Sequence, residues 1–162
     1  MKKWKYSGLA LIDEVNNLKP RAVLDVGCGY NEFKGKIDNL IGIDPYNDEA
    51  DLKVSTLEYK TNQKFDAILC LGSVNFGNRD KIIAEVSRCV HLLADSGIMF
   101  FRVNPGVQHD KPEAYWIEFF GWNVPFIIEL SNMFNLDILD IRDDTNQRKY
   151  FIFRKKLTNL EK

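Results

Sequence analysis

The sequence predicts an α/β fold: a doubly wound, mostly parallel sheet of seven strands that ends in a C-terminal antiparallel hairpin, with helices on both faces. Two observations predict the alternating part. Short apolar runs that end at glycine or aspartate alternate with segments whose apolar residues recur at helical spacing. A third observation predicts the hairpin, because the last two apolar runs are separated only by a short polar loop.

The N-terminal half supplies a helix and three strands. Ser7 can cap a helix in segment 1–20, where apolar residues fall on one face. Between the first two strands, residues 32–37 form only a turn or two of helix, which is short for a crossover between parallel strands. The strands are apolar runs bounded by turn signals, at 22–26, 40–43 and, on a weaker pattern, 52–56.

The C-terminal half alternates strands and helices more regularly. Its helices have apolar residues three or four apart, over 79–93 and from Pro125 onward. Its strands are again short apolar runs, at 67–71, 98–103, 136–142 and 149–154. The last two form the hairpin, which makes one strand near the end of the sheet antiparallel, and residues 155–162 form a tail.

The composition bounds the class of protein. Its 22 basic and 23 acidic residues give a formal net charge of −1, whereas nucleic-acid partners usually select a basic stripe. No apolar run reaches the roughly 20 residues needed to cross a bilayer, and the first residues lack the apolar segment of a signal peptide. The three cysteines lack CxxC spacing. We therefore expect a single reduced, cytoplasmic domain over residues 1–162, without a nucleic-acid or membrane partner.

A glycine-rich turn follows the first strand. Gly27 and Gly29 flank Cys28, so the backbone can turn tightly and approach a ligand without a Cβ in the way. Several nucleotide-binding folds share such a turn, and dinucleotide folds continue to a third glycine where this chain has Glu32. A carboxylate at that position disfavours a pyrophosphate.

Two aspartates indicate the chemical class of the ligand at this turn. Asp25, just before the glycine turn, suits a cationic group such as the ammonium of an amino acid. Asp44 ends the second strand, where a carboxylate can accept both hydroxyls of a ribose. Taken alone, either residue could be a cap or a turn aspartate, Asp44 before Pro45. Together, at neighbouring strand ends, they indicate a nucleoside ligand that carries a positive charge.

These motifs resemble those of the class I methyltransferases that depend on S-adenosylmethionine (SAM), from about Trp4 to Arg154. The similar segments are Val23–Tyr30, Ile41–Asp44, Phe65–Ser73 and Leu92–Ile98. The resemblance implies SAM as cofactor and S-adenosylhomocysteine (SAH) as product.

The resemblance also implies the cofactor contacts. Gly27, Cys28 and Gly29 would line the methionine end, with Asp25 near its amino group, and Asp44 would hold the ribose. The remaining implied contacts are Tyr6 over the methionine, Pro45 beside the ribose site, Thr56 and Leu57 over the adenine, and Cys70, Leu71 and Gly72 toward the sulfonium.

The chain departs from the family pattern at three places. Asn31 stands where many members carry a third glycine. The first crossover is about a turn shorter than usual. Ser55 occupies the position of an acidic residue that is often found in the adenine loop.

Fewer features of the sequence indicate the acceptor site. The segment after the fourth strand lacks the Asn/Asp-Pro-Pro-aromatic string of family members that act on amide or base nitrogens, so a DNA base is disfavoured. His109 is a candidate base in the loop after the fifth strand, the alternative being an exposed loop histidine, and His91 is assigned a structural role. The candidate substrate contacts are Asn75, Asn104, His109 and Tyr115, and no metal site is expected.

Two functions therefore stay open. The first is a SAM-dependent methyltransferase that acts on an oxygen, carbon or nitrogen of a small molecule or of an exposed group. The second is a non-catalytic SAM-binding scaffold or partner subunit, indicated by Asn31, by the short crossover and by the lack of room for a substrate domain; a homo-oligomer is also possible. A nicotinamide dehydrogenase is a third hypothesis, disfavoured by Asp25, Glu32 and the hairpin.

Overall fold

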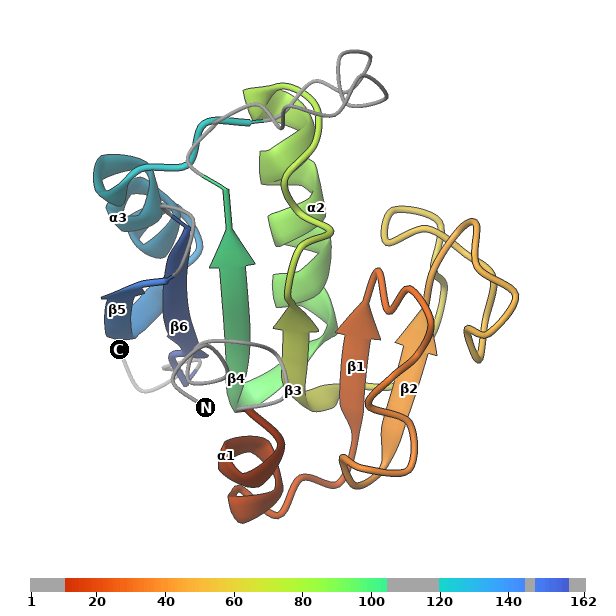
Figure 1. The fold of residues 1–162 in the computed structure, drawn as a ribbon. Coiled ribbons are helices and arrows are strands. Elements are labelled where there is room, and N and C mark those ends of the chain that lie inside the picture. The colour runs from red at the N-terminus through yellow and green to blue at the C-terminus, as the bar shows by residue number, and fades with distance from the viewer. Residues whose placement is uncertain (1–10, 105–119, 145–147, 158–162) are drawn as a thin grey trace.

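The computed structural model describes residues 11–104, 120–144 and 148–157. Within them a six-stranded sheet has the order β2-β1-β3-β4-β6-β5, which can be followed across Figure 1. The strands are β1 (Val23–Val26), β2 (Leu40–Ile43), β3 (Phe65–Cys70), β4 (Leu93–Val103), β5 (Leu136–Asp143) and β6 (Lys149–Lys155). The helices are α1 (Leu11–Asn17), α2 (Arg79–Leu92) and α3 (Val124–Met133).

The strand directions confirm the mostly parallel sheet. Strands β2, β1, β3 and β4 run parallel to one another, whereas β6 is antiparallel to both of its neighbours, β4 and β5. The antiparallel strand near the end of the sheet is therefore β6. Because parallel strands end at one edge, the segments that follow β1, β2, β3 and β4 meet there, which is where ligands bind in such sheets.

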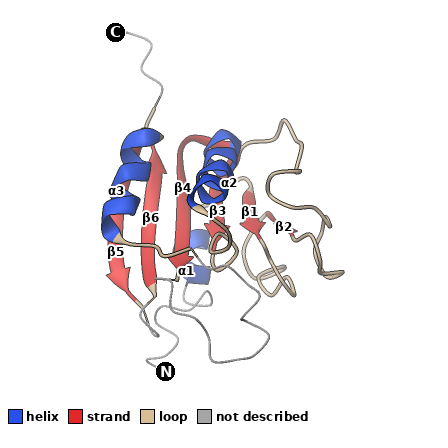
Figure 2. Cartoon of the chain, turned by 90° about the horizontal axis from the view of Figure 1, so that it is seen from above, coloured by secondary structure: helices blue, strands red, loops and turns tan. Residues whose placement is uncertain are grey.

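Helices cover both faces of the sheet (Figure 2), as the sequence predicts. Apolar residues of α2 and α3 pack with one set of alternating strand residues, and those of α1 pack with the other set. The strands supply both cores because successive side chains point to opposite faces. Trp122 belongs to the larger core, where its ring lies 5.5 Å from that of Phe151. Trp122, which follows β4, is therefore a core residue.

The predicted strand at 52–56 does not form. Leu52 makes only an isolated bridge to Ile43, and no strand follows it. The backbone turns instead, because the Ser55 carbonyl accepts hydrogen bonds from the N–H groups of Glu58 and Tyr59, at 3.2 and 3.0 Å. The sheet has six strands over the described residues as a result.

The predicted helix at 32–37 is also absent. Successive turns replace it, with Lys34 N–H donating to Asn31 O and Ile37 N–H to Phe33 O. Asn31 and Gly35 have φ angles of 60° and 82°, in the left-handed region that a right-handed helix cannot include. The crossover from β1 to β2 is thus a chain of turns.

The remaining boundaries differ little from the prediction. Strand β4 begins earlier than expected, since Leu93 already pairs with Phe65 before the register shifts to Ala67 and Ile98. Helix α3 begins at Val124, with the Asn123 side chain as its N-cap. None of the helices in the described part of the chain is long and apolar enough to cross a membrane.

Candidate functional site

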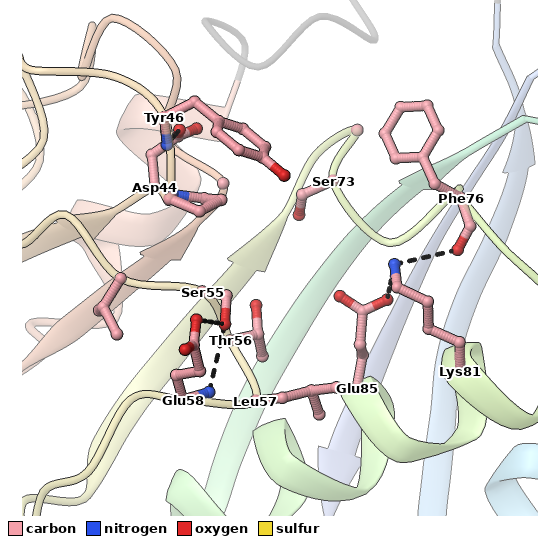
Figure 3. Close-up of a pocket in the computed structure, with 14 residues that line it drawn as sticks. Asp44, Tyr46, Ser55, Thr56, Leu57, Glu58, Ser73, Phe76, Lys81 and Glu85 are labelled. Atoms are coloured by element: carbon pink, nitrogen blue, oxygen red, sulfur yellow. Dashed lines mark hydrogen bonds and ion pairs between the residues drawn. The ribbon is translucent and has the colours of Figure 1, made fainter. Parts of the chain in front are cut away.

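A cavity of about 650 Å³, here called the larger cavity, lies at the carboxyl ends of β1, β2 and β3 (Figure 3). Half of the predicted cofactor contacts line it: Gly27 after β1, Asp44 and Pro45 after β2, Gly72 after β3, and Thr56 and Leu57 from the segment between β2 and β3. The fold therefore brings together residues that four separate segments supply.

The other predicted cofactor contacts do not line this cavity. Asp25, Cys28 and Gly29 lie around the glycine turn, while Cys70 is fully buried in the core. Leu71 lines a smaller neighbouring cavity. Tyr6 lies outside the described residues.

Gly27 needs to be glycine for two reasons. Its φ angle of 68° is costly for other residues. A Cβ at this position would also lie 2.2 Å from the Cβ of Ser73, whose hydroxyl donates a 2.7 Å hydrogen bond to Val26 O. The first strand end is thus packed directly against the third.

Asp44 joins the glycine turn to the end of β2. Its Oδ2 accepts from Gly29 N–H at 3.1 Å, and its Oδ1 accepts from the N–H groups of Tyr46 and Asn47 at 2.8 and 3.0 Å. Asp44 is therefore a turn aspartate, which is one of the two alternatives that the sequence left open. Its carboxylate also lines the larger cavity. Each carboxylate oxygen can accept two hydrogen bonds, so one acceptor position, on Oδ2, remains for a ligand.

Asp25 is a buried carboxyl with 4% of its surface exposed. Burial, and then the charge of Asp44, raise its pKa to about 7. No group in the described residues donates a hydrogen bond to it. A cation bound nearby would stabilise the charged form.

The surroundings of Cys28 disfavour its thiolate form. Burial, together with the carboxylates of Asp25 and Asp44, raises the pKa of its thiol to about 12. Its backbone N–H donates to Ile43 O at 2.9 Å. This hydrogen bond ties the glycine turn to the end of β2.

Asn31 keeps the backbone conformation that a third glycine would supply. Its φ of 60° is one that asparagine tolerates better than other residues do. Its Nδ2 donates to Glu49 O at 3.0 Å, which ties the turn to the segment after β2. This departure from the family pattern therefore leaves the turn intact.

Sequence reasoning missed an acidic residue in the larger cavity. The Ser55 hydroxyl donates a 2.7 Å hydrogen bond to the Glu58 carboxylate, and both residues line the cavity (Figure 3). Serine followed three residues later by glutamate is the spacing of a capping box, a signal that could have found this pair. Ser55 occupies the position where the family often has an acidic residue. Glu58 supplies a carboxylate next to that position.

Helix α2 supplies a second missed pair. Lys81 Nζ lies 3.3 Å from the Glu85 carboxylate and 3.3 Å from Phe76 O, and all three residues line the larger cavity. Burial raises the pKa of Glu85, and the Lys81 charge opposes that rise. In the sequence the pair looks like an ordinary polar face of an amphipathic helix, so no signal marks it. Tyr46, Val54 and Ser73 complete the missed lining residues.

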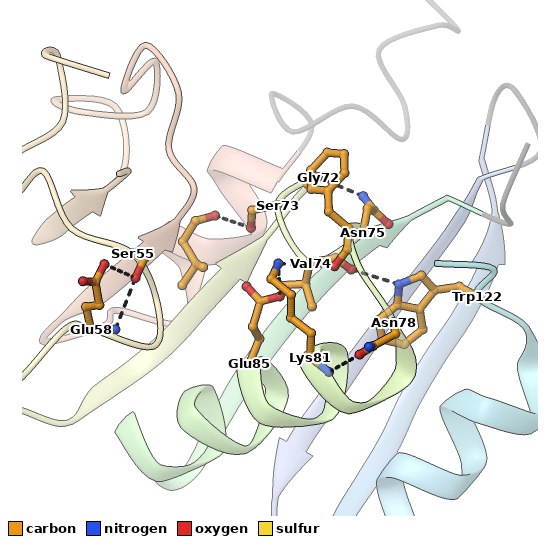
Figure 4. A network of polar contacts seen from close by, with 12 residues as sticks. Ser55, Glu58, Gly72, Ser73, Val74, Asn75, Asn78, Lys81, Glu85 and Trp122 are labelled. Carbon is orange, nitrogen blue, oxygen red and sulfur yellow. Dashed lines mark hydrogen bonds and ion pairs between the residues drawn. The ribbon is translucent and has the colours of Figure 1, made fainter. Parts of the chain in front are cut away.

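A smaller cavity of about 230 Å³ adjoins the larger one, because Gly72 and Phe76 line both. Two predicted substrate contacts, Asn75 and Asn104, are here. Asn75 Oδ1 accepts from Asn104 N–H at 2.8 Å. Its Nδ2 donates to Gly72 O at 3.0 Å (Figure 4). Its side chain thus fixes the segments after β3 and β4 to each other.

Trp122 reinforces the same connection, since its Nε1 donates to Val74 O at 2.9 Å (Figure 4). The two other predicted substrate contacts, His109 and Tyr115, lie outside the described residues. His91 is exposed near the end of α2 and lines neither cavity. Among residues 11–104, 120–144 and 148–157, no group of three His, Cys, Asp or Glu side chains is placed to hold a metal ion.

No model of a protein family matches the sequence, and no curated protein matches it. Solved structures match the fold. The N-methyltransferase NodS of Bradyrhizobium japonicum WM9 aligns at a TM-score of 0.67 and 14% identity, over 91% of this chain and 93% of that one. A SAM-dependent methyltransferase of Clostridium acetobutylicum ATCC 824 aligns at 0.68 and 16% identity, over 96% and 92%.

A third match has a ligand. The 1,6-didemethyltoxoflavin-N1-methyltransferase of Burkholderia thailandensis, solved with 1,6-didemethyltoxoflavin and SAH, aligns at a TM-score of 0.72 and 16% identity, over 94% of this chain and 80% of that one. The chain therefore has the fold of the class I SAM-dependent methyltransferases.

Proposed function

We propose that this chain binds SAM in the larger cavity and transfers its methyl group to a small-molecule acceptor. One observation carries the proposal: the cavity joins the glycine turn and the acidic end of β2 to the end of β3 in a sheet of this fold. Its described lining includes three carboxylates, Asp44, Glu58 and Glu85, and one ammonium, Lys81. An excess of acidic groups suits a cationic ligand such as SAM.

The residues present fit this cofactor. The buried Asp25 carboxyl lacks a hydrogen-bond donor among the described residues and would gain one from the ammonium of the methionine end. The remaining acceptor position of Asp44, on Oδ2, would accept one ribose hydroxyl. Thr56 and Leu57 would contact the adenine beside the Ser55–Glu58 pair, and Gly72 would border the sulfur.

The chain's own task in the reaction is alignment. When bound, SAM supplies a methyl group activated by its sulfonium, so that a nucleophile of the acceptor bonds to the methyl carbon while the carbon–sulfur bond breaks. Groups held at the ends of β1, β2 and β3 then need to orient two reactants and exclude water more than to react themselves. The Asn75 side chain, which fixes two of the segments around Gly72, is a positioning residue in this scheme.

The acceptor is proposed to be a small metabolite and not a DNA base. The solved structures that match the fold include a 1,6-didemethyltoxoflavin-N1-methyltransferase and a member of an O-methyltransferase family. After β3 this chain reads Gly72-Ser73-Val74-Asn75-Phe76, without the proline pair that the resemblance associates with base nitrogens.

Calorimetry with SAM and SAH tests the binding step, and we expect one site per chain with both ligands. Incubation of a cell extract with the protein and SAM labelled in its methyl group tests transfer. A labelled small molecule that forms only with the protein would support the proposal. Absence of binding would refute it, whereas binding without transfer would assign the chain to the non-catalytic scaffold.

A further inference from the structure

The smaller cavity carries the opposite charge to the larger one. Its described lining has two guanidinium groups, Arg102 and Arg148, and no carboxylate. Arg102 lies near the end of β4, and Arg148 immediately precedes β6. These two strands are antiparallel neighbours, so the end of one meets the start of the other. The antiparallel insertion of β6 therefore places the second guanidinium at the ligand-binding edge of the sheet.

The two guanidinium groups differ in their partners. Arg102 Nε donates to the carboxylate of Asp144, whose side chain is only 1% exposed. The guanidinium of Arg148 is half-buried and makes no hydrogen bond or ion pair with the described residues. Burial and then the charge of Arg102 lower the pKa of Arg148, while Asp144 opposes the shift. An anion bound beside Arg148 would offset both destabilising effects.

The position of the smaller cavity links it to the proposed reaction. Gly72 and Phe76 form the boundary between the two cavities. Asn75 holds this boundary in place through Gly72 O and Asn104 N–H. A molecule anchored at Arg148 would thus share its cavity with Gly72, which borders the cofactor's sulfur in the proposed function.

We propose that the smaller cavity is the acceptor pocket and that it selects small acceptors with a carboxylate. The inference rests on the proposed function. A guanidinium binds a carboxylate through two parallel hydrogen bonds, so it supplies orientation as well as charge. Among the described residues, the two guanidinium groups and the buried Asp144 carboxylate leave a single positive charge, which matches a monoanion. A volume of about 230 Å³ restricts the acceptor to a small molecule.

The test uses protein saturated with SAH and two matched pairs of probes: benzoate with benzamide, and glycolate with glycolamide. We expect at least one carboxylate to bind roughly tenfold or more tightly than its neutral amide, as measured by calorimetry, because the amide lacks the charge that Arg148 recognises. Arg148→Gln should abolish this preference, and Arg148→Lys should retain part of it. The control is Arg154→Gln on β6, which removes a surface pair with Asp137 and should leave the preference unchanged.

Several results would overturn the inference: equal binding of acids and amides, no binding of either carboxylate, or a preference that survives Arg148→Gln. Inorganic phosphate that binds more tightly than both carboxylates, and depends on Arg148, would overturn the carboxylate assignment. SAH affinity is measured on every variant. Retained SAH binding without a carboxylate preference refutes only this inference, whereas loss of SAH binding by the wild type refutes the proposed function itself.

Discussion

The two cavities lie on either side of one short segment and carry opposite charges. The larger one is acidic because the loops after β2 and the face of α2 supply Asp44, Glu58 and Glu85. The smaller one is basic because the region between β4 and β6 supplies Arg102 and Arg148. The parallel half of the sheet thus makes the acidic cavity, and the antiparallel strand completes the basic one. The comparison indicates how a small single sheet can separate a cationic cofactor from an anionic acceptor.

The opposite charges also favour the binding of each ligand in its own cavity. A cation is attracted to the acidic cavity and repelled by the basic one, and the reverse holds for an anion. The shared wall is short, since Gly72 and Phe76 are the described residues common to both linings. A change confined to one cavity should therefore alter one ligand and spare the other.

The largest effect is expected from Gly27→Ala, which places a methyl group in the wall of the larger cavity. Gly29→Ala, in the same turn but outside that wall, is its control. Gly29→Ala should cost about 1–2 kcal/mol of unfolding free energy, because only the left-handed backbone is strained and no atom lies within 4 Å of the new Cβ. Gly27→Ala should cost about 1–3 kcal/mol more, because its Cβ overlaps Ser73. Urea unfolding measures both variants. Equal losses, or a Gly27→Ala loss that Ser73→Gly does not reduce, would contradict the packing described.

Removal of the Asp44 carboxylate should weaken SAH binding roughly 10- to 100-fold, the usual effect of losing hydrogen bonds to a charged group. Benzoate binding in the smaller cavity should change little. The matched control is Asp48→Ala in the same loop, whose side chain is 87% exposed and pairs with Lys53. Calorimetry with each variant distinguishes them, and wild-type affinity in Asp44→Ala would remove Asp44 from the site.

A pH change should alter the binding of SAH and leave the binding of a carboxylate unchanged. With a pKa of about 7, the charged fraction of Asp25 falls about fivefold between pH 7 and pH 6, and SAH affinity should fall by about the same factor. The ligand's own ammonium stays protonated in this window. Glu85 also has a raised pKa, so the comparison with Asp25→Asn isolates Asp25. A wild-type profile that Asp25→Asn reproduces would show that Asp25 does not face the ammonium.

The smallest effect is expected at the missing third glycine. Asn31→Gly keeps the left-handed backbone and loses one hydrogen bond to Glu49 O, so SAH affinity should change by less than about threefold. Asn39→Gly is a close control, since Asn39 has a φ of 59° and donates to Pro20 O at 2.9 Å, away from both cavities. A loss above tenfold in Asn31→Gly alone would mean that the Asn31 side chain itself holds the ligand.

The sequence predicts those parts of the fold that local pattern determines. The runs at 22–26, 40–43 and 67–71 form strands within about two residues because they are buried on both faces and end at turn residues. The pattern at 52–56 wrongly predicts a strand. Its β-branched residues Val54 and Thr56 line the larger cavity and do not belong to the sheet. Residues 32–37 fail as a helix because Asn31 and Gly35 take left-handed conformations that the sequence does not reveal.

The candidate site divides in a similar way. Gly27, Asp44 and Gly72 could be placed from sequence because each stands at a strand end, and strand ends meet at one edge of a parallel sheet. Lys81 and Glu85 could not, since only the packing of α2 over that edge turns its polar face into a cavity wall. Arg148 could not either, because its position depends on the insertion of β6 between β4 and β5.

Backbone amide NMR of the isotope-labelled wild type during titration with SAH locates the bound ligand residue by residue. If SAM binds in the larger cavity, saturable shifts should concentrate at Gly27, Asp44, Thr56 and Gly72, which represent the four segments that meet there. Arg148, in the smaller cavity, should respond little until a carboxylate is added. No saturable shift, or shifts confined to residues outside the larger cavity, would contradict the assignment of that cavity to SAM.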